Sequence, residues 1–311
     1  MSLVPWQVKL ALRGAGGEPV DLWRTIASHG LVELPPMRVD EERRSLEVTL
    51  ALRRGRPRTV EIAPSDGAAV VSIAGPRPSE TLAAELLDRA RHVLRLDEDL
   101  SEFYAVAAQD PALAWATRGA GRMVRSPTVF EDVVKTICTT NCAWSATERM
   151  VAGLVRHLGE PAAGTPADGS YGRAFPTPAA MAEADEGFYR DVVRAGYRGA
   201  YLRALATSVA AGDVDLEQLG TTRREELPDD EVELRLLALP GVGPYAAAHV
   251  MMLLGRYSRL ILDSWTRPKY AKLNGRRASD QTIARRFRRY GPYAGLAFWL
   301  YLTRDWVADE G

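Results

Sequence analysis

The chain has 311 residues, of which 46% are hydrophobic and 26% are charged, and its 40 basic side chains balance 40 acidic ones. This composition excludes a disordered or fibrous protein, and no stretch approaches the roughly 18 apolar residues that a membrane-spanning helix needs. With two cysteines, the chain has too few thiolates for an iron–sulfur cluster, which takes four.

The N-terminal quarter of the chain predicts β structure. Apolar and polar side chains alternate with a period of two in residues 45–52, 59–63 and 69–73. Segments containing Gly55 and Gly67 separate these strands in the manner of hairpin turns. Because a sheet with one apolar face needs a partner layer, we expect an antiparallel sheet in residues 1–78 that packs against the rest of the chain.

From Ser79 onward the apolar residues follow the spacing of a helix. Segments with this spacing are residues 80–96, 127–140, 141–158, 229–239 and 293–301. Ser126–Pro127 and Thr177–Pro178 predict helix starts, because the φ angle of proline suits the first helical position. Residues 159–176 are rich in Gly, Ala and Pro and predict a surface loop. The sequence therefore predicts an α+β protein that is mainly α.

Residues 236–249 contain the most informative motif, in which Pro-Gly-Val-Gly joins two helical segments. Gly241 and Gly243 allow a sharp turn with positive φ and let bare backbone approach a ligand. The helix that starts at Pro244 directs free amides outward with a partial positive charge, which suits a phosphate. A sequence-independent grip on a DNA backbone is one interpretation, and a plain tight turn is the other.

A single carboxylate, Asp263, follows the apolar run Leu260–Leu262 and precedes Ser-Trp-Thr, where a helix could start. One interpretation is an N-cap, which aspartate favours. The other is catalytic, because breaking an N-glycosidic bond develops positive charge on the sugar, which a nearby carboxylate stabilises. The same carboxylate can orient or deprotonate the attacking water. The two roles are compatible.

Residues 256–289 carry eleven basic and two acidic side chains, a local charge of +9 in a chain of zero net charge. Such asymmetry predicts a surface for a polyanion. The alternative is a solvated helical face whose charges are paired elsewhere.

Three segments, in the order expected, resemble the helix-hairpin-helix (HhH-GPD) DNA glycosylase superfamily. They are residues 126–141, residues 195–203, and the Pro-Gly-Val-Gly hairpin with Asp263. The resemblance is to the 3-methyladenine DNA glycosylase II and 8-oxoguanine DNA glycosylase families. It implies an N-terminal antiparallel sheet subdomain (1–78) packed on a two-part helical glycosylase region (79–311). That region divides into a core (127–235), the hairpin with the catalytic aspartate (236–263), and C-terminal helices (264–311) that pack with residues 79–126.

The position two residues after the second hairpin glycine indicates the mechanism. Bifunctional members of the superfamily carry a nucleophilic lysine there, which forms a Schiff base with the sugar. This chain has Tyr245, and a phenol cannot form a Schiff base. The resemblance therefore implies a monofunctional DNA glycosylase of base excision repair, with alkylated purines as the favoured lesions. The alternatives are an 8-oxoguanine-type glycosylase/lyase that uses another lysine, and a non-catalytic protein that binds damaged DNA.

Tyr245 and His249 are spaced i and i+4 and share a helix face, which the resemblance places against the extruded base. We expect the two rings to sandwich a planar base, although core packing is an alternative. A further wall is assigned to Tyr301, which spacing alone does not separate from Phe298 and Trp299.

Three residues match superfamily positions that contact the DNA around the extruded base. Asn141 corresponds to the residue that fills the vacated gap, with a helix C-cap as the alternative. Tyr197 corresponds to a wedge beside the opposite strand, and Arg198 to an arginine that contacts the opposite base. A surface turn is the alternative for both.

The resemblance also implies that backbone carbonyls of Leu237, Leu239 and Val242 hold a sodium or potassium ion in the hairpin, with no other cofactor. The expected partner is double-stranded damaged DNA, bound by a monomer that does not act at a membrane. The residues before Lys9 lack a secretory signal pattern, and Cys138 and Cys142 suit the core of a reduced protein, so we expect a cytoplasmic location.

Overall fold

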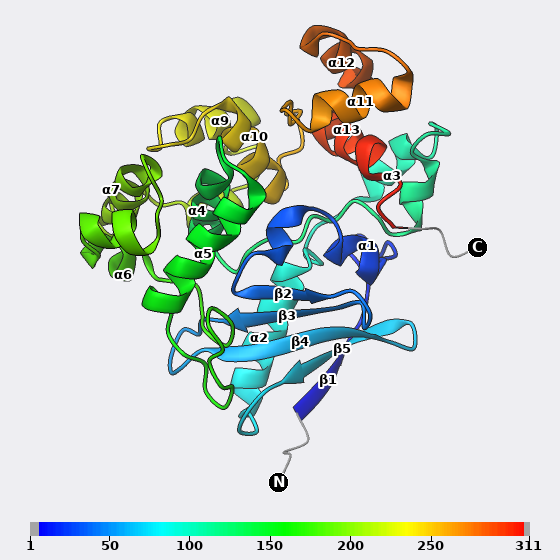
Figure 1. Ribbon diagram of the computed structural model, residues 1–311. Coiled ribbons are helices and arrows are strands. Elements are labelled where there is room, and N and C mark those ends of the chain that lie inside the picture. Colours follow the sequence, from blue (N-terminus) through cyan, green and yellow to red (C-terminus); the bar gives the residue numbers. More distant parts are fainter. Residues whose placement is uncertain (1–5, 308–311) are drawn as a thin grey trace.

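The computed structural model describes residues 6–307, so the outermost residues of the predicted N- and C-terminal segments lie outside the described range. A five-stranded antiparallel sheet occupies one end of the molecule and helices form the remainder (Figure 1). This arrangement confirms the α+β, mainly α fold class. Within residues 6–307, no helix combines the length and the apolar character needed to cross a membrane.

The sheet has the strand order β1-β5-β4-β3-β2. Its strands are β1 (Trp6–Leu10), β2 (Met37–Asp40), β3 (Ser45–Leu50), β4 (Arg58–Ser65) and β5 (Ala68–Ile73). The three predicted strands are confirmed as β3, β4 and β5. The strands β1 and β2 were not predicted separately and form the two edges of the sheet.

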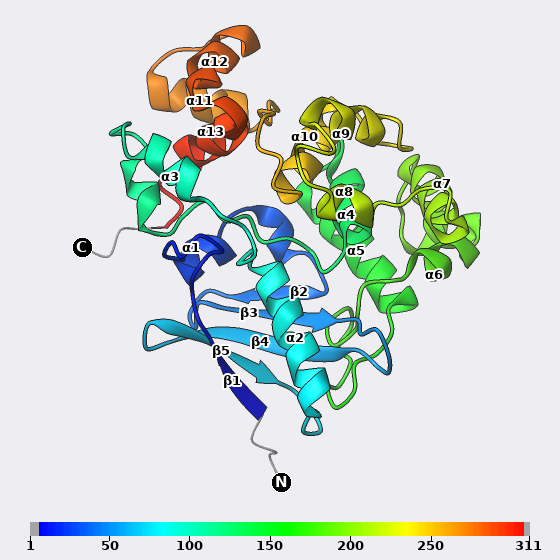
Figure 2. The same cartoon turned by 180° about the vertical axis from the view of Figure 1, so that it is seen from behind.

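The helix α2 (Glu80–Val93) covers one face of the sheet (Figure 2). The Ser79 hydroxyl caps its N-terminus by accepting the Leu82 N–H at 3.3 Å. Leu86 and Val93 belong to the same buried apolar cluster as strand residues such as Val48. Burial of each such side chain contributes roughly 1.5–3 kcal/mol. The helix α2 therefore completes the core of the sheet, whereas the sequence grouped it with the helical region.

The short helix α1 (Leu22–Ile26) also packs in the core of the sheet, through Leu22 and Ile26. The remaining helices surround a second, larger apolar core. They are α3 (Ser101–Ala107), α4 (Val129–Thr139), α5 (Trp144–Leu158), α6 (Pro178–Glu183), α7 (Arg198–Ala211), α8 (Glu217–Thr221), α9 (Asp229–Leu237), α10 (Pro244–Leu253), α11 (Thr266–Asn274), α12 (Asp280–Phe287) and α13 (Ala294–Thr303). Short 3-10 or π turns cover Gly30–Glu33, Ala114–Arg118, Phe188–Val192 and Arg288–Tyr293. The C-terminal helices contact the segment around α3, where Tyr293 donates to Glu102 at 3.0 Å.

The helix α4 lies in this core and starts two residues later than Ser126–Pro127 predicts. Its N-cap is Thr128, whose hydroxyl accepts the Glu131 N–H at 3.2 Å. Glu217 of α8 accepts the next free amides, those of Val129 and Phe130, at 3.1 and 3.2 Å. These acceptors satisfy the helix terminus, so proline is not needed at the first position. The start of α6 at Thr177–Pro178 is confirmed.

Candidate active site

Four separate segments of the chain line a cleft with a volume of about 720 Å³. They are the turn after α4, the start of α7, the hairpin between α9 and α10, and the residues before α11. Among the residues predicted to act on DNA, the cleft is lined by Asn141, Tyr197, Gly241, Gly243, Pro244, Tyr245 and Asp263. The fold therefore brings together the hairpin and the single carboxylate that stood out in the sequence.

The two hairpin glycines serve different purposes. Gly241 has φ of 78°, and an added Cβ would lie 2.9 Å from the Cβ of Tyr201, so both backbone and space require glycine. Gly243 has φ of −102°, which any residue adopts, so the expectation of positive φ is wrong there. An added Cβ at Gly243 would meet nothing within 4 Å. Gly243 therefore leaves its backbone bare toward the cleft.

The helix α10 begins at Pro244 without a side-chain cap. Its first turn lines the cleft, so the free amides of that turn face the open space. Free amides at a helix N-terminus attract an anion, because the helix dipole adds to their partial positive charge. The geometry thus suits a phosphate at the hairpin.

Asp263 is half-buried at the edge of the cleft and caps α11. Its Oδ1 accepts the N–H groups of Trp265 and Thr266 at 2.8 and 2.6 Å. The Thr266 hydroxyl in turn accepts the Asp263 N–H at 2.8 Å. Within the described part of the chain, Oδ2 makes no hydrogen bond. The cap role is therefore present, and it holds the carboxylate in one orientation with one oxygen available to a ligand.

Tyr245 and His249 do not form a sandwich for a base. Their ring centroids are 4.9 Å apart at an interplanar angle of 60°, so the two rings contact each other. A planar base between two rings needs about 7 Å, twice the usual contact distance. The predicted sandwich is therefore wrong, and the two rings form one wall. Tyr245 is the part of this wall that reaches the cleft.

Trp299, and not Tyr301, extends this wall. The Trp299 ring lies 6.1 Å from His249, and its indole N–H donates to the Ser28 carbonyl at 2.8 Å. Tyr301 packs 6.2 Å from Tyr270 and donates to Asn274 at 3.0 Å, on the other side of α13. Two residues along a helix differ by about 200° in direction, so both cannot face the same wall. The assignment of Tyr301 to the pocket is therefore wrong.

Trp265 is a site residue that no pattern in the sequence singles out. Its ring lies 5.6 Å from Trp299 and is 39% exposed, directly after Asp263 and Ser264. Its position beside the wall arises because the Asp263 cap fixes the start of α11 against α13. No local pattern in the sequence reports that contact.

Burial lowers the pKa of His249 to about 4, so its imidazole is neutral at physiological pH. His29 lies nearby and also has a pKa of about 4 through burial. Its Nε2–H donates to the Val124 carbonyl at 2.6 Å. Both imidazoles are therefore neutral at pH 7, and neither can act as a general acid there.

Because of these two buried histidines, we expect the folded protein to be less stable in acid. Both pKa values lie below the ordinary value of 6.5, so the unfolded chain binds more protons between pH 6.5 and 4. The free energy of unfolding should fall by roughly 2 kcal/mol per histidine between pH 7 and pH 5. Asp132, whose pKa burial raises to about 6, opposes part of this loss. Urea unfolding at the two pH values measures the effect, and H249Q should show a smaller loss. A free energy independent of pH would contradict it.

Asn141 and Tyr197 lie together at the rim of the cleft. Asn141 is exposed, has φ of 47°, and donates from Nδ2 to the Tyr197 hydroxyl at 3.4 Å. The left-handed backbone is one that asparagine tolerates better than most residues. Tyr197 is 54% exposed. Their roles on DNA stay predictions, but both side chains are accessible to a duplex.

Arg198 is buried and does not reach outward. Its Nε donates to the Thr140 hydroxyl at 3.3 Å, and its Nη2 donates to the Thr140 carbonyl. The predicted contact with the opposite base is therefore not what this geometry provides. Arg198 instead holds the turn that presents Asn141.

Substituting Arg198→Ala should lower the free energy of unfolding by about 2 kcal/mol, because a buried carbonyl loses a charged donor. Opposite-base preference should not change. Thermal unfolding and binding to duplexes with four opposite bases measure these effects. Arg203→Ala is the control, because Arg203 lies on the same helix with an exposed pair to Glu186 at 3.8 Å. Unchanged stability with lost base preference would restore the base-contact role.

No protein-family model matches the chain, and no curated protein matches its sequence. Solved structures do match along most of its length. The 3-methyladenine DNA glycosylase of Archaeoglobus fulgidus is similar with a TM-score of 0.70 at 21% identity, over 97% of this chain and 100% of that one. The chain has the fold of these DNA glycosylases.

An 8-oxoguanine enzyme has the same fold. The 8-oxoguanine glycosylase/lyase of Clostridium acetobutylicum, in complex with double-stranded DNA containing cytosine opposite 8-oxoguanine, matches with a TM-score of 0.69 at 20% identity. The match covers 92% of each chain. One fold is thus shared by a 3-methyladenine DNA glycosylase and an 8-oxoguanine glycosylase/lyase, so the fold alone does not separate the two.

Proposed function

We propose that this protein is a monofunctional DNA glycosylase of base excision repair, which extrudes a damaged base from double-stranded DNA and hydrolyses its N-glycosidic bond. One observation carries the proposal. A single cleft, in a DNA glycosylase fold, contains both the uncapped hairpin helix and the oriented carboxylate of Asp263.

Each part of the cleft has a role in this reaction. The α10 amides bind a phosphate beside the lesion, while Asn141 fills the gap left in the duplex and Tyr197 acts as a wedge beside the opposite strand. The extruded base rests against the Tyr245 wall. As the bond between base and sugar breaks, Oδ2 of Asp263 stabilises the positive charge on the sugar. Water then bonds to C1′ and gives up a proton to the same carboxylate.

The neutral histidines favour alkylated purines as substrates. A purine nucleotide alkylated at ring N3 or N7 is cationic and its base departs as a neutral molecule, so it needs no proton donor. A neutral damaged base departs more easily when it is protonated. His249 cannot supply that proton near pH 7, because burial lowers its pKa to about 4. The neutral state of His249 thus supports an alkylated purine, rather than 8-oxoguanine, as the substrate.

The distribution of lysine supports hydrolysis without strand cleavage. The chain has only four lysines, and none of them lines the cleft. Lys135 is buried against Glu131 at 2.7 Å, and Lys269 pairs with Asp305 at 2.7 Å. Lys9 lies on the sheet, and Lys272 lies near the far end of α11.

Further parts of the proposal concern the surroundings of the hairpin and the state of the protein. The carbonyls of Leu237, Leu239 and Val242 are proposed to hold a sodium or potassium ion that braces the turn. Within residues 6–307, no cluster of three or more His, Cys, Asp or Glu side chains could hold a metal. The protein is proposed to act as a cytoplasmic monomer on DNA.

A panel of single-lesion duplexes tests the proposed substrate. Purified protein should release free base from duplexes with 3-methyladenine or 7-methylguanine at least tenfold faster than from duplexes with 8-oxoguanine. Faster release of 8-oxoguanine would support an 8-oxoguanine-type enzyme instead. Tight binding without release of any base would support a non-catalytic damage-binding protein.

A further inference from the structure

The basic run in residues 256–289 separates into two groups in the structure. Six of its eleven cations are engaged by other side chains. These are Arg256 with Asp229, Arg259 with Asp230 and Glu233, Arg267 with Asp280, Lys269 with Asp305, Arg286 with Asn274 and Tyr270, and Arg289 with Asp110. The local charge of +9 is therefore not one continuous field.

The other five cations are all exposed, and none has an ion pair with a described residue. We call them the distal basic patch, and they are Lys272, Arg276, Arg277, Arg285 and Arg288. They occupy the end of α11, the loop after it, α12, and the first residue of the 3-10 turn that follows α12. The only acidic residue between positions 264 and 304 is Asp280, which Arg267 already binds through two hydrogen bonds of 2.8 and 2.9 Å.

These five positive charges are close together in the sequence and lack acidic partners, so they repel one another, and this repulsion is relieved when a polyanion binds. The rest of the chain is net negative, so this segment stands out as basic. A field of one sign on one face is typical of a surface for nucleic-acid phosphates.

The patch has a defined place relative to the cleft. Asp263 caps the N-terminus of α11, and the patch begins near the other end of this nine-residue helix. At 1.5 Å per residue, the helix carries the patch about 13 Å beyond Asp263. Duplex DNA advances about 3.4 Å per base pair, so the distance corresponds to roughly four base pairs. Figure 1 shows α9 and α10 followed by α11 and α12 at the end of the molecule opposite the sheet.

We propose that the distal basic patch binds phosphates of the duplex that flanks the lesion on one side, about three to six base pairs from the extruded nucleotide. The proposal rests on the proposed function, because it takes the substrate to be a damaged duplex. It adds a second DNA contact, separate from the hairpin. The patch then determines how much intact duplex the protein requires beside a lesion.

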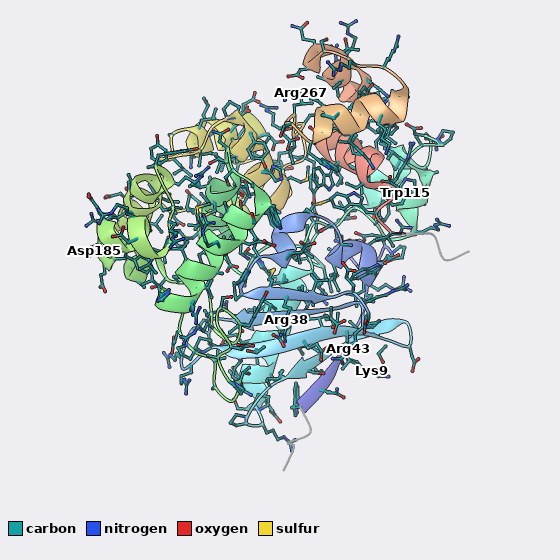
Figure 3. The ribbon with its side chains drawn as sticks, in the orientation of Figure 1. Lys9, Arg38, Arg43, Trp115, Asp185 and Arg267 are labelled. Carbon is teal, nitrogen blue, oxygen red and sulfur yellow. The ribbon has the colours of Figure 1, made fainter. Side chains whose placement is uncertain are left out.

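The test compares two variants with the same loss of charge. K272Q/R276Q/R277Q removes three patch cations, and K9Q/R54Q/R77Q removes three exposed cations near the sheet. Figure 3 shows Lys9 and Arg267 toward opposite ends of the molecule, so the control lies far from the patch. The probes are duplexes with an abasic-site analogue, either short on both sides or extended by ten base pairs on one side.

Wild-type protein should bind one of the two one-sided extensions at least tenfold more tightly than the short duplex. The patch variant should lose this gain, and its slope of log K against log salt should fall by about 0.9 for each lost contact. The sheet control should behave as wild type. Equal binding of the extended duplex by patch variant and wild type would overturn the proposal. So would a patch variant that loses affinity for anionic lipid vesicles but not for DNA.

Failure of the proposed function is distinguishable from failure of this inference. If wild-type protein released no base but the patch variant lost the higher affinity for the extended duplex, only the proposed function would be wrong. If base was released and the patch variant kept this higher affinity, only the patch proposal would be wrong.

Discussion

Replacing Asp263 by asparagine is expected to lower the rate of base release by about 10²–10³-fold, with DNA affinity within about twofold of wild type. The magnitude is that of losing one group that stabilises charge in a transition state. Single-turnover release of 7-methylguanine measures the rate, and titration with an abasic-site duplex measures the affinity.

Asparagine keeps the cap while removing the charge. Its side-chain oxygen still accepts the N–H groups of Trp265 and Thr266, so α11 should begin at the same residue. Asp263→Ala should in addition lower the free energy of unfolding by about 1 kcal/mol, because the cap is lost. Asp280→Asn is the matched control, since that carboxylate starts α12 and pairs with Arg267 at 2.8 Å. Wild-type release by Asp263→Asn would disprove the mechanism.

Borohydride is expected to trap no covalent complex between the wild-type protein and abasic DNA. Trapping needs a primary amine at C1′, and the cleft contains no lysine. Tyr245→Lys is the matched positive control, because it places an amine at the position that the resemblance assigns to the nucleophilic lysine of bifunctional glycosylases. A trapped band should appear for this variant alone. A band with wild-type protein would show that another amine reaches the sugar.

The parts of the fold that the sequence predicted are those set by local pattern. The alternating apolar residues of β3, β4 and β5 and the cap at Thr177–Pro178 act over a few residues, so they could be identified without tertiary contacts. The edge strand Trp6–Leu10 alternates in the same way, but it is short and pairs with β5 across 59 to 67 residues of sequence. The start of α4 was placed too early because Glu217, a distant residue, satisfies its first amides.

The site residues that belong to a local motif could be predicted from the sequence. Those whose position depends on packing between distant segments could not. The hairpin and Asp263 lie together in the cleft as the motif suggested. The choice between Trp299 and Tyr301 depends on which face of α13 meets His249, and spacing within the helix does not report it. Arg198 turned inward because the Thr140 carbonyl, on another element, accepts from its guanidinium. The direction in which a helical side chain points is therefore the step that required the structure.

One measurement tests the central claim most directly. Purified protein is incubated with a duplex containing one 7-methylguanine, and free base and strand length are measured from the same sample before and after alkali. The proposed function predicts free base in proportion to enzyme turnover, an intact strand before alkali, and a cut strand after it. No free base, or a strand cut before alkali, would contradict a hydrolytic DNA glycosylase.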